Sequence, residues 1–125
     1  MLLQQENHNT MEYQAVINVH LSYNNTIVTL CTPCGIVIDW ASGGSIGFKG
    51  SRRASSSAAS AAVRNIAETC VTKRLRNVSV RFEGVGKGRS GVLSGLDKNK
   101  LKVINLVDTT HFPHNGCRPP SRRRL

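Results

Sequence analysis

The first part of the chain alternates apolar and polar residues with a period of two. In the range Tyr13–Leu21 every second side chain is apolar, which predicts a β-strand with one buried face. Residues 26–30 and 36–40 are rich in β-branched and apolar side chains and predict two further strands. Short turns at residues 22–25 and 32–35 separate the three strands, so we expect an antiparallel meander.

The middle of the chain changes to helical spacing. Small apolar residues recur with a period of 3.6 across residues 54–75, which predicts a helix that can lie close on a sheet, with Ser51 or Ser55 as its N-cap. Cys70 falls on the apolar side of that helix, so we interpret it as a core residue. Residues 77–82 alternate again and predict a fourth strand.

Two further elements complete the predicted domain, a short helix over residues 90–97 and a strand over residues 101–107. That strand is nearly continuously apolar, which is typical of a strand covered on both faces. A helix between two strands implies a parallel, right-handed crossover. We therefore expect one α/β domain, a five-stranded mixed sheet with two helices, over residues 13–110, between a flexible segment 1–12 and an extended basic tail 111–125.

Charge is distributed unevenly along the 125 residues. The chain carries 17 Lys and Arg against 7 Asp and Glu, a net charge of +10. Residues 1–48 contain no basic residue, so all 17 lie in residues 49–125. This asymmetry predicts one oriented face that binds a polyanion. No apolar run reaches the roughly 18 residues that a membrane-spanning helix needs, so we expect no membrane partner.

The first basic residues lie in a glycine-rich loop, Gly43–Arg53. Lys49, Arg52 and Arg53 follow a long stretch without a cation. Glycines allow backbone amides to approach an anion closely, and the cations supply opposite charge. We prefer phosphate binding to the alternative of an ordinary flexible loop before a helix.

A second glycine-rich basic loop precedes the short helix. Gly86–Gly91 matches the G-x-G-x-x-G spacing of a dinucleotide-binding fingerprint, and Asp108 follows at a suitable distance. Only one strand–helix–strand unit is available, however, and Lys87 and Arg89 stand inside the motif. We therefore prefer contact with nucleic-acid phosphates, with a nucleotide-dependent enzyme as the alternative.

The tail 111–125 combines prolines with arginines. Arg118 precedes two prolines, and three consecutive arginines at residues 122–124 follow. Guanidinium groups bind phosphate oxygens in a bidentate way, and proline stiffness lowers the entropy lost on binding. We expect a tail ordered on RNA rather than a disordered solubilising tail. Within it, Asn115 precedes a glycine, whose exposed amide favours succinimide and isoaspartate formation; the alternative is a simple turn.

Other chemistry has little support in the sequence. Cys31 and Cys34 have CxxC spacing, but a zinc site needs four ligands, and Cys117 with a nearby histidine would complete one only by an accident of folding. A redox CxxC should open a helix, whereas this pair lies in a predicted turn. The acidic residues show no paired spacing for acid–base or two-metal catalysis. We expect no enzyme, no cofactor and no metal, with zinc-dependent nucleic-acid binding as a minor alternative.

Four segments occur together in an order that resembles one family. They are Tyr23–Thr29, Trp40–Arg52, Gly84–Arg89 and His114–Pro120 with its arginine end. Together they resemble the small-subunit ribosomal protein eleven family, the universal platform protein, in its bacterial or organellar form, over about Tyr13–Leu125. The resemblance implies a ribonuclease-H-like topology without catalysis. It also implies a structural role in translation, with binding to small-subunit rRNA at the platform near the messenger exit path.

The same resemblance implies partners and contact residues. The expected partners are small-subunit rRNA, neighbouring platform proteins and messenger RNA near the exit. The expected RNA contacts are Asn24, Asn25, Lys49, Ser51, Arg52, Arg53, Lys87, Arg89, His114, Asn115, Arg118, Arg122, Arg123 and Arg124. The isoaspartate-prone position of the family matches Asn115.

The chain departs from the usual family pattern in places. Val85 stands where proline is usual, Ser55–Ser57 replace Thr-Pro-Phe at the helix start, and the Cys31/Cys34 turn is not a family feature. The N-terminus carries no secretion or transit signal, so either the protein stays where it is made or a presequence has been removed. The departures from the family pattern favour an organelle ribosome in the mitochondrial matrix, with the plastid stroma or the bacterial cytoplasm as alternatives.

Overall fold

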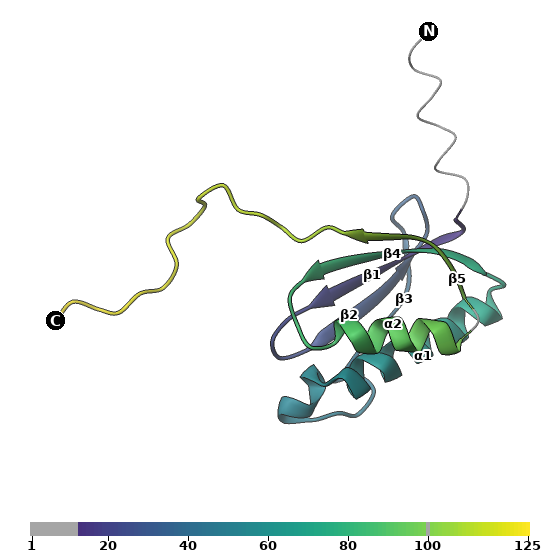
Figure 1. The fold of residues 1–125 in the computed structure, drawn as a ribbon, viewed down its shortest axis with the longest axis horizontal. Coiled ribbons are helices and arrows are strands. Elements are labelled where there is room, and N and C mark those ends of the chain that lie inside the picture. Colours follow the sequence, from purple (N-terminus) through teal and green to yellow (C-terminus); the bar gives the residue numbers. More distant parts are fainter. Residues whose placement is uncertain (1–12, 100) are drawn as a thin grey trace, which may run out of the picture.

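A five-stranded sheet with two helices against one of its faces forms the folded part of the chain (Figure 1). The computed structural model describes residues 13–99 and 101–125, so the predicted flexible segment 1–12 lies outside the described residues. In chain order the elements are β1 (Ala15–Leu21), β2 (Thr26–Cys31), β3 (Val37–Ser42), a 3₁₀ helix η1 (Gly50–Ala54), α1 (Ser56–Thr72), β4 (Asn77–Gly84), α2 (Arg89–Lys98) and β5 (Lys102–Asp108).

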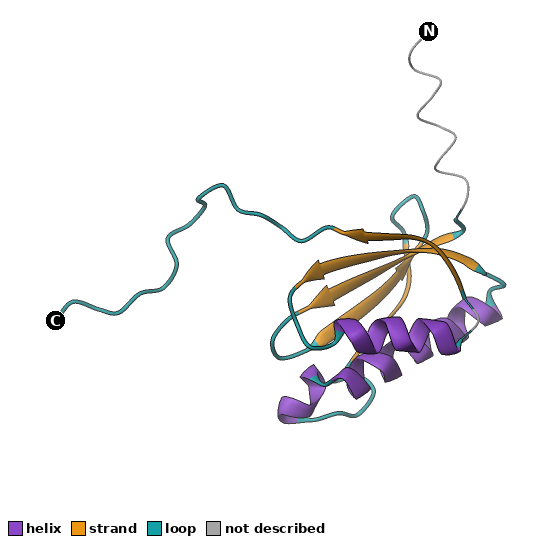
Figure 2. Cartoon of the chain, in the orientation of Figure 1, coloured by secondary structure: helices purple, strands orange, loops and turns teal. Residues whose placement is uncertain are grey.

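The strand order across the sheet is β3-β2-β1-β4-β5. β1, β2 and β3 pair in antiparallel fashion, which confirms the predicted meander. β4 pairs in parallel with both β1 and β5, which confirms the mixed sheet and the parallel crossover through α2. Both helices lie on the same side of the sheet and leave its other face without a helix (Figure 2).

The core lies between the sheet and α1. Ala59, Ala62, Val63 and Ile66 are fully buried against the inward side chains of β1, β2 and β4. Because alanine is small, α1 can approach the sheet closely, as its composition predicts. Cys70 is also fully buried, which confirms its predicted role in the core; burial raises the pKa of its thiol to about 11.

The start of α1 distinguishes the two predicted caps. Ser55 has extended backbone, and its Oγ accepts a hydrogen bond from the Ala58 amide at 3.2 Å, so Ser55 is the N-cap. Ser51 lies instead in the separate 3₁₀ helix, and α1 therefore begins later than residue 54. At the other end a left-handed residue, Arg74, stops the helix before residue 75.

The prediction that the last strand is covered on both faces is wrong. β5 is one of the two edge strands of the sheet, and the exposed fractions of Leu106 and Val107 are 54% and 44%. The physical reason is that α2 packs mainly against α1 rather than beneath β5. A continuous apolar run shows that a strand is hydrophobic, but it does not show that a partner element covers it.

Two glycines of the second loop allow unusually close packing at one end of the sheet. A Cβ on Gly88 would lie 2.3 Å from Thr26 Oγ1, and a Cβ on Gly91 would lie 2.1 Å from the Ser56 carbonyl oxygen. Both distances are shorter than any real contact of a Cβ atom. The missing side chains therefore allow the N-terminus of α2 to contact the start of β2 and the first turn of α1.

We expect Gly91→Ala to lower the free energy of unfolding by about 1–3 kcal/mol, because the added methyl group pushes α2 away from α1. Alanine normally stabilises a helix relative to glycine by about 1 kcal/mol, so a net loss can come only from this close approach. Urea denaturation measures the change. Gly116→Ala is the control, since nothing lies within 4 Å of the added Cβ. An unchanged or higher stability for Gly91→Ala would contradict this packing.

Candidate nucleic-acid interface

Three loops with predicted contact residues meet at one end of the sheet, which we call the loop pole. It consists of the turn 22–25, the loop 43–53 and the loop 84–89. β1, β3, β4 and β5 all run in the same direction, so the loops that follow β1, β3 and β4, and the tail that follows β5, leave the sheet at this common end (Figure 1). The topology thus brings together residues that are more than 60 positions apart in the sequence.

The turn after β1 is held by its own side chains. The Asn25 amide donates to Ser22 Oγ at 3.0 Å, and Asn25 Oδ1 accepts from the Thr26 amide at 2.9 Å. The Ser22 hydroxyl and the half-buried Asn25 side chain thus close the turn, while Asn24 remains exposed. Tyr23 is 83% exposed beside it. Asn25 therefore positions the turn, and Tyr23 and Asn24 are the groups that a ligand can reach.

Gly43 joins this turn to the first glycine-rich loop. Its amide donates to the Thr26 carbonyl at 3.2 Å. A Cβ at this position would lie 2.9 Å from Asn25 Oδ1 and 2.6 Å from the Arg53 carbonyl oxygen. The glycine thus allows the turn, the loop and the 3₁₀ helix to pack closely against one another. Its main role is close packing of protein on protein, rather than the phosphate cradle that the sequence suggested.

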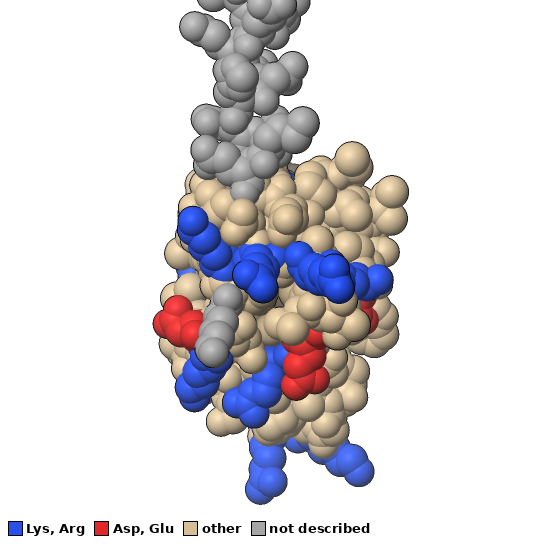
Figure 3. Space-filling model, turned by 90° about the vertical axis from the view of Figure 1, so that its right-hand side faces the viewer, with Lys and Arg blue, Asp and Glu red and all other residues tan. Residues whose placement is uncertain are grey.

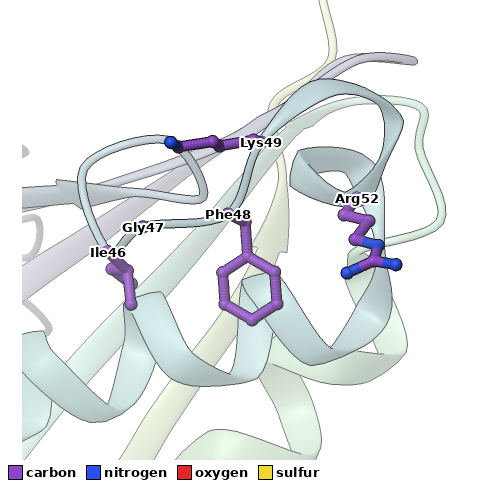
Figure 4. Close-up of a pocket in the computed structure, with 5 residues that line it drawn as sticks. All are labelled: Ile46, Gly47, Phe48, Lys49 and Arg52. Carbon is purple, nitrogen blue, oxygen red and sulfur yellow. The ribbon is translucent and has the colours of Figure 1, made fainter.

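The outer part of this loop surrounds a concavity of 520 Å³ lined by Ile46, Gly47, Phe48, Lys49 and Arg52 (Figure 4). Ile46, Phe48 and Arg52 extend to the same side of the loop, whereas Lys49 extends away from them (Figure 4). An aromatic ring next to a guanidinium can stack on a nucleotide base while the cation binds a phosphate. Lys49 is free to reach a second phosphate.

The remaining cations of the loop pole differ in their roles. Arg53 is exposed, but its Nε donates to the Gly50 carbonyl at 3.3 Å, so it also holds its own loop together. Lys87 is exposed and belongs to neither of the two salt bridges found among the described residues. Arg89 forms one of them, with Asp108 at 3.1 Å, and its guanidinium lies 4.8 Å from the centre of the Phe82 ring. Arg89 thus ties the start of α2 to the end of β5.

The tail starts from this ion pair. Thr110 donates hydrogen bonds to the Asp108 carboxylate from its amide and its hydroxyl, and these bonds, together with Arg89, lower the pKa of Asp108 to about 2. The Thr109 amide donates to the Phe82 carbonyl at 2.7 Å, and the Gly84 amide donates to Thr110 Oγ1 at 3.2 Å. The chain is therefore fixed to the loop pole as far as Thr110.

Residues 111–125 are exposed and extend away from the domain (Figure 1). Arg118, Arg122 and Arg124 line a shallow concavity of 560 Å³ within the tail itself. Asn115 has a positive φ of 76° and remains exposed, as do His114 and Arg123. The structure thus anchors the predicted tail residues at the loop pole but does not pack them onto it.

Two aromatic residues of the loop pole, the exposed Tyr23 and the half-buried Phe48, were missed as contact residues. Tyr23 precedes the predicted Asn24, and Phe48 precedes the predicted Lys49. Only six residues in the chain are aromatic, so an aromatic side chain next to a polar turn or a cation was a usable sign of base stacking. Charged residues and glycines alone do not indicate these two aromatic side chains.

The alternative chemistries gain no support from the geometry. The Ser56 carbonyl oxygen lies against Gly91 at the start of α2, where a dinucleotide would need to place its pyrophosphate. Cys31 is buried in β2 and Cys34 is exposed in the following turn; in residues 13–99 and 101–125 no three His, Cys, Asp or Glu side chains gather as a metal site. None of the described helices is long and apolar enough to cross a membrane.

The expectation of a single basic face is wrong. Five cations lie at the opposite end of the sheet from the loop pole: Lys73, Arg74, Arg76, Lys98 and Lys102. We call this end the helix-end pole, because α1 and α2 both end there (Figure 1), and Figure 3 shows Lys and Arg side chains in blue across it. The sequence separates acidic from basic segments, but consecutive elements of the basic half run in opposite directions and carry their charges to both ends of the sheet.

Comparison with known proteins gives one consistent family. The family model described as "Ribosomal protein S11" matches residues 15–124. The protein "Small ribosomal subunit protein uS11c" of Chlorella vulgaris is 44% identical over 110 residues, which cover 88% of this chain and 85% of that protein. "Small ribosomal subunit protein uS11" of Chlamydia muridarum is 44% identical over 110 residues (88% and 83%), and that of Francisella tularensis subsp. mediasiatica is 41% identical over 111 residues (89% and 86%).

The hydrogen bonds of Asp108 predict a specific acid sensitivity. The native pKa lies below the ordinary value of 3.8, so the carboxylate contributes its full stabilisation above about pH 4 and loses it as the pH falls towards 2. We expect Asp108→Asn to flatten the loss of stability between pH 5 and about pH 2.5, measured by urea denaturation. Asp97→Asn is the control, because Asp97 is exposed and belongs to neither salt bridge of the described chain. If the stability of Asp108→Asn falls as steeply with decreasing pH as that of the unmodified chain, Asp108 does not have this role.

Proposed function

Because the chain belongs to the ribosomal protein S11 family, and so is a small-subunit ribosomal protein with a structural, non-enzymatic role in translation, we propose that its loop pole and tail bind small-subunit rRNA at the platform. The observation that carries this proposal is the convergence of three loops and the anchored tail at one end of the sheet. Cations, the exposed Tyr23 and the half-buried Phe48 lie there beside backbone turns that are already closed.

The loop pole divides its residues between contact and positioning. We assign direct phosphate contact to Lys49, Arg52 and Lys87, whose side chains are exposed. Ser51, Asn24 and the two aromatic residues offer hydrogen bonds and stacking surfaces to bases and sugars. Asn25, Arg53 and Arg89 hold the turn, the loop and the α2 start in place. Because the turn, the loop and the α2 start are already held in place, their backbone loses little entropy on binding, which supports recognition of one folded RNA surface.

The tail contributes in a different way. Residues 111–125 are exposed, and their arginines face no protein partner among the described residues. His114, Asn115, Arg118 and the three arginines 122–124 can therefore follow an RNA groove and neutralise its phosphates. The prolines restrict the free conformations of the tail and lower the entropic cost of that ordering.

Finer aspects of this assignment are also part of the proposal. A tail that leaves the domain from the RNA-binding end can extend towards messenger RNA at the exit path and towards neighbouring platform proteins. The relatives are of bacterial and chloroplast type. We retain an organelle ribosome in the mitochondrial matrix as the predicted location, with the plastid stroma and the bacterial cytoplasm as alternatives, on the basis of the sequence drift described above.

Neutralising the loop pole should weaken RNA binding in a salt-dependent way. For Lys49→Gln/Arg52→Gln we expect the slope of log K against log salt concentration to fall in magnitude by about 1.4–1.8, which corresponds to two lost phosphate contacts. Filter binding of the full chain to small-subunit rRNA measures it. Arg64→Gln/Arg81→Gln removes the same charge from the middle of α1 and β4 and should change the slope much less. If the salt slopes of the two double variants are equal, the loop pole does not bind RNA in the proposed way.

The Asn115–Gly116 pair should convert to isoaspartate. Asn115 is exposed, and nothing lies within 4 Å of the position that a Cβ on Gly116 would occupy. The backbone amide of Gly116 can therefore attack the Asn115 side-chain carbonyl and release ammonia. The succinimide that forms is then opened by water. We expect isoaspartyl methyltransferase to label the peptide that contains Asn115 after incubation of the protein at neutral pH. Gly116→Ala should slow the labelling because its methyl group hinders the attack. Absence of label in the unmodified chain would refute this site.

A further inference from the structure

The segment that joins the first glycine-rich loop to α1 places two cations directly before a hydroxyl group. It reads Arg52-Arg53-Ala54-Ser55 and is followed by Ser56 and Ser57. Ser55 is the only serine or threonine of the chain that has arginine both two and three residues before it. Residues 40–67 contain no Asp or Glu, so no acid nearby in the sequence offsets the two cations.

The two arginines are accessible to a partner. Arg52 and Arg53 are exposed, and neither belongs to the two salt bridges found among residues 13–99 and 101–125. Both lie on η1, a 3₁₀ helix of five residues that contains no buried residue. Because no core side chain is uncovered when such a short helix unwinds, η1 can open locally at low cost.

The Ser55 hydroxyl lies at the point where the chain passes from η1 into α1. The backbone of Ser55 is already extended, with φ −71° and ψ 155°, and protein kinases bind their substrates as extended segments. Ser55 Oγ donates to the Arg52 carbonyl at 2.7 Å and accepts from the Ala58 amide at 3.2 Å. The first of these bonds is lost when η1 opens. The opening that presents the two arginines therefore also frees the hydroxyl.

The two adjacent serines are poorer acceptors. Ser56 has arginine three residues before it but not two, and its Oγ lies 3.5 Å from Ser90 Oγ at the start of α2. Ser57 has arginine at neither position. Both serines lie within α1, which packs on the core, so an enzyme could reach them in extended form only by unwinding that helix. The arrangement thus selects Ser55 from three consecutive serines.

We propose that Ser55 is a phosphorylation site for a protein kinase with an acidic substrate groove, and that the phosphate weakens RNA binding by the loop pole. The inference rests on the function proposed above and adds its regulation. Carboxylates of the groove pair with Arg52 and Arg53. In the transfer, the Ser55 hydroxyl oxygen bonds to the γ-phosphorus of ATP, and the bond from that phosphorus to the β–γ bridging oxygen breaks. ADP leaves, and the hydroxyl proton passes to the carboxylate base of the kinase.

The phosphate acts on RNA binding through its charge. It adds about −1.5 to −2 near pH 7, which offsets roughly two of the three cations of the loop 43–53, namely Lys49, Arg52 and Arg53. Its oxygens accept hydrogen bonds from guanidinium groups and so compete with RNA phosphates for the same donors. The remaining negative charge repels the RNA backbone. Both effects lower the affinity of the loop pole for RNA.

The fold keeps its helix cap after the modification. A phosphoserine at position 55 still offers oxygen atoms to the Ala58 amide, and negative charge at a helix N-terminus is favourable. The first turn of α1 contains no acidic residue that would repel the group. A loss of RNA affinity on phosphorylation therefore reports on the loop pole and does not result from unfolding.

Phosphorylation of the folded full chain tests the site. We expect the catalytic subunit of cyclic-AMP-dependent protein kinase, which selects arginine at these two positions, to place phosphate from Mg-ATP on Ser55 faster than on any other serine. Peptide mass spectrometry locates the phosphate. Arg52→Gln/Arg53→Gln should slow the reaction at least tenfold, whereas Arg64→Gln/Arg81→Gln removes the same charge elsewhere and should not slow it.

Ser55→Asn provides the matched acceptor control. Asparagine is a good N-cap residue but has no hydroxyl, so the variant should fold normally and gain no phosphate at position 55. Absence of phosphate on Ser55 in the unmodified folded chain would overturn the proposal. Phosphate spread evenly over Ser55, Ser56 and Ser57 would overturn it too, because the arginines would then not select the acceptor.

Binding of the phosphorylated chain to small-subunit rRNA tests the regulation. We expect the Kd to rise roughly tenfold at 0.1 M salt, and the slope of log K against log salt concentration to fall in magnitude by about 1.4–1.8, as for two lost phosphate contacts. Ser55→Asn treated with the same kinase and ATP should bind like the untreated chain.

The outcomes separate this inference from the proposed function. If the phosphorylated chain binds RNA like the untreated chain while Lys49→Gln/Arg52→Gln binds more weakly, the regulation is refuted and the RNA-binding role of the loop pole stands. If neither change weakens binding, both proposals are wrong.

Discussion

The structure depends on one close approach, between the start of α2, the first turn of α1 and the start of β2. Gly88 and Gly91 make it possible, because a Cβ at either position would collide with Thr26 or with the Ser56 carbonyl. This contact fixes both helix N-termini at the end of the sheet where four strands end. The loops that leave this end are consequently held at the same end of the sheet, together with their cations and aromatic side chains.

The charge distribution follows from topology rather than from sequence order. The basic half of the chain consists of helices and strands that run in opposite directions, so its cations alternate between the two ends of the sheet. The loop pole carries Lys49 and Arg52 beside a concavity and anchors the tail, while Arg74 and Arg76 of the helix-end pole line a cleft. The uneven charge of the sequence therefore does not become a single basic face in the folded domain.

The sequence predicted the fold well because its periodicities were clear. The period of two in β1 and β4 and the small residues of α1 correctly indicated which faces are buried. The burial of β5 was predicted wrongly, because hydrophobicity does not show which neighbours a strand has. The glycines of the second loop were recognised, but their function as packing positions depends on Ser56 and Thr26, which lie far away in the sequence.

The candidate site was predictable only in part. Exposed cations such as Lys49 and Lys87 could be found from composition and loop position, whereas the pairing of Arg89 with Asp108 depends on the parallel register of β4 and β5. The second basic pole was invisible for the same reason, since sequence alone does not give strand direction for each charge. Resemblance to a family supplied the partner, and the structure shows which of the predicted residues bond to other parts of the protein.

The most direct test of the central claim is a structure of the assembled small ribosomal subunit that contains this chain. RNA binding through the loop pole predicts phosphate oxygens within hydrogen-bonding distance of the Lys49 and Arg52 side chains, and a tail that follows an RNA groove from Thr110 onward. A loop pole covered by protein or facing solvent, with no phosphate at either cation, would contradict it.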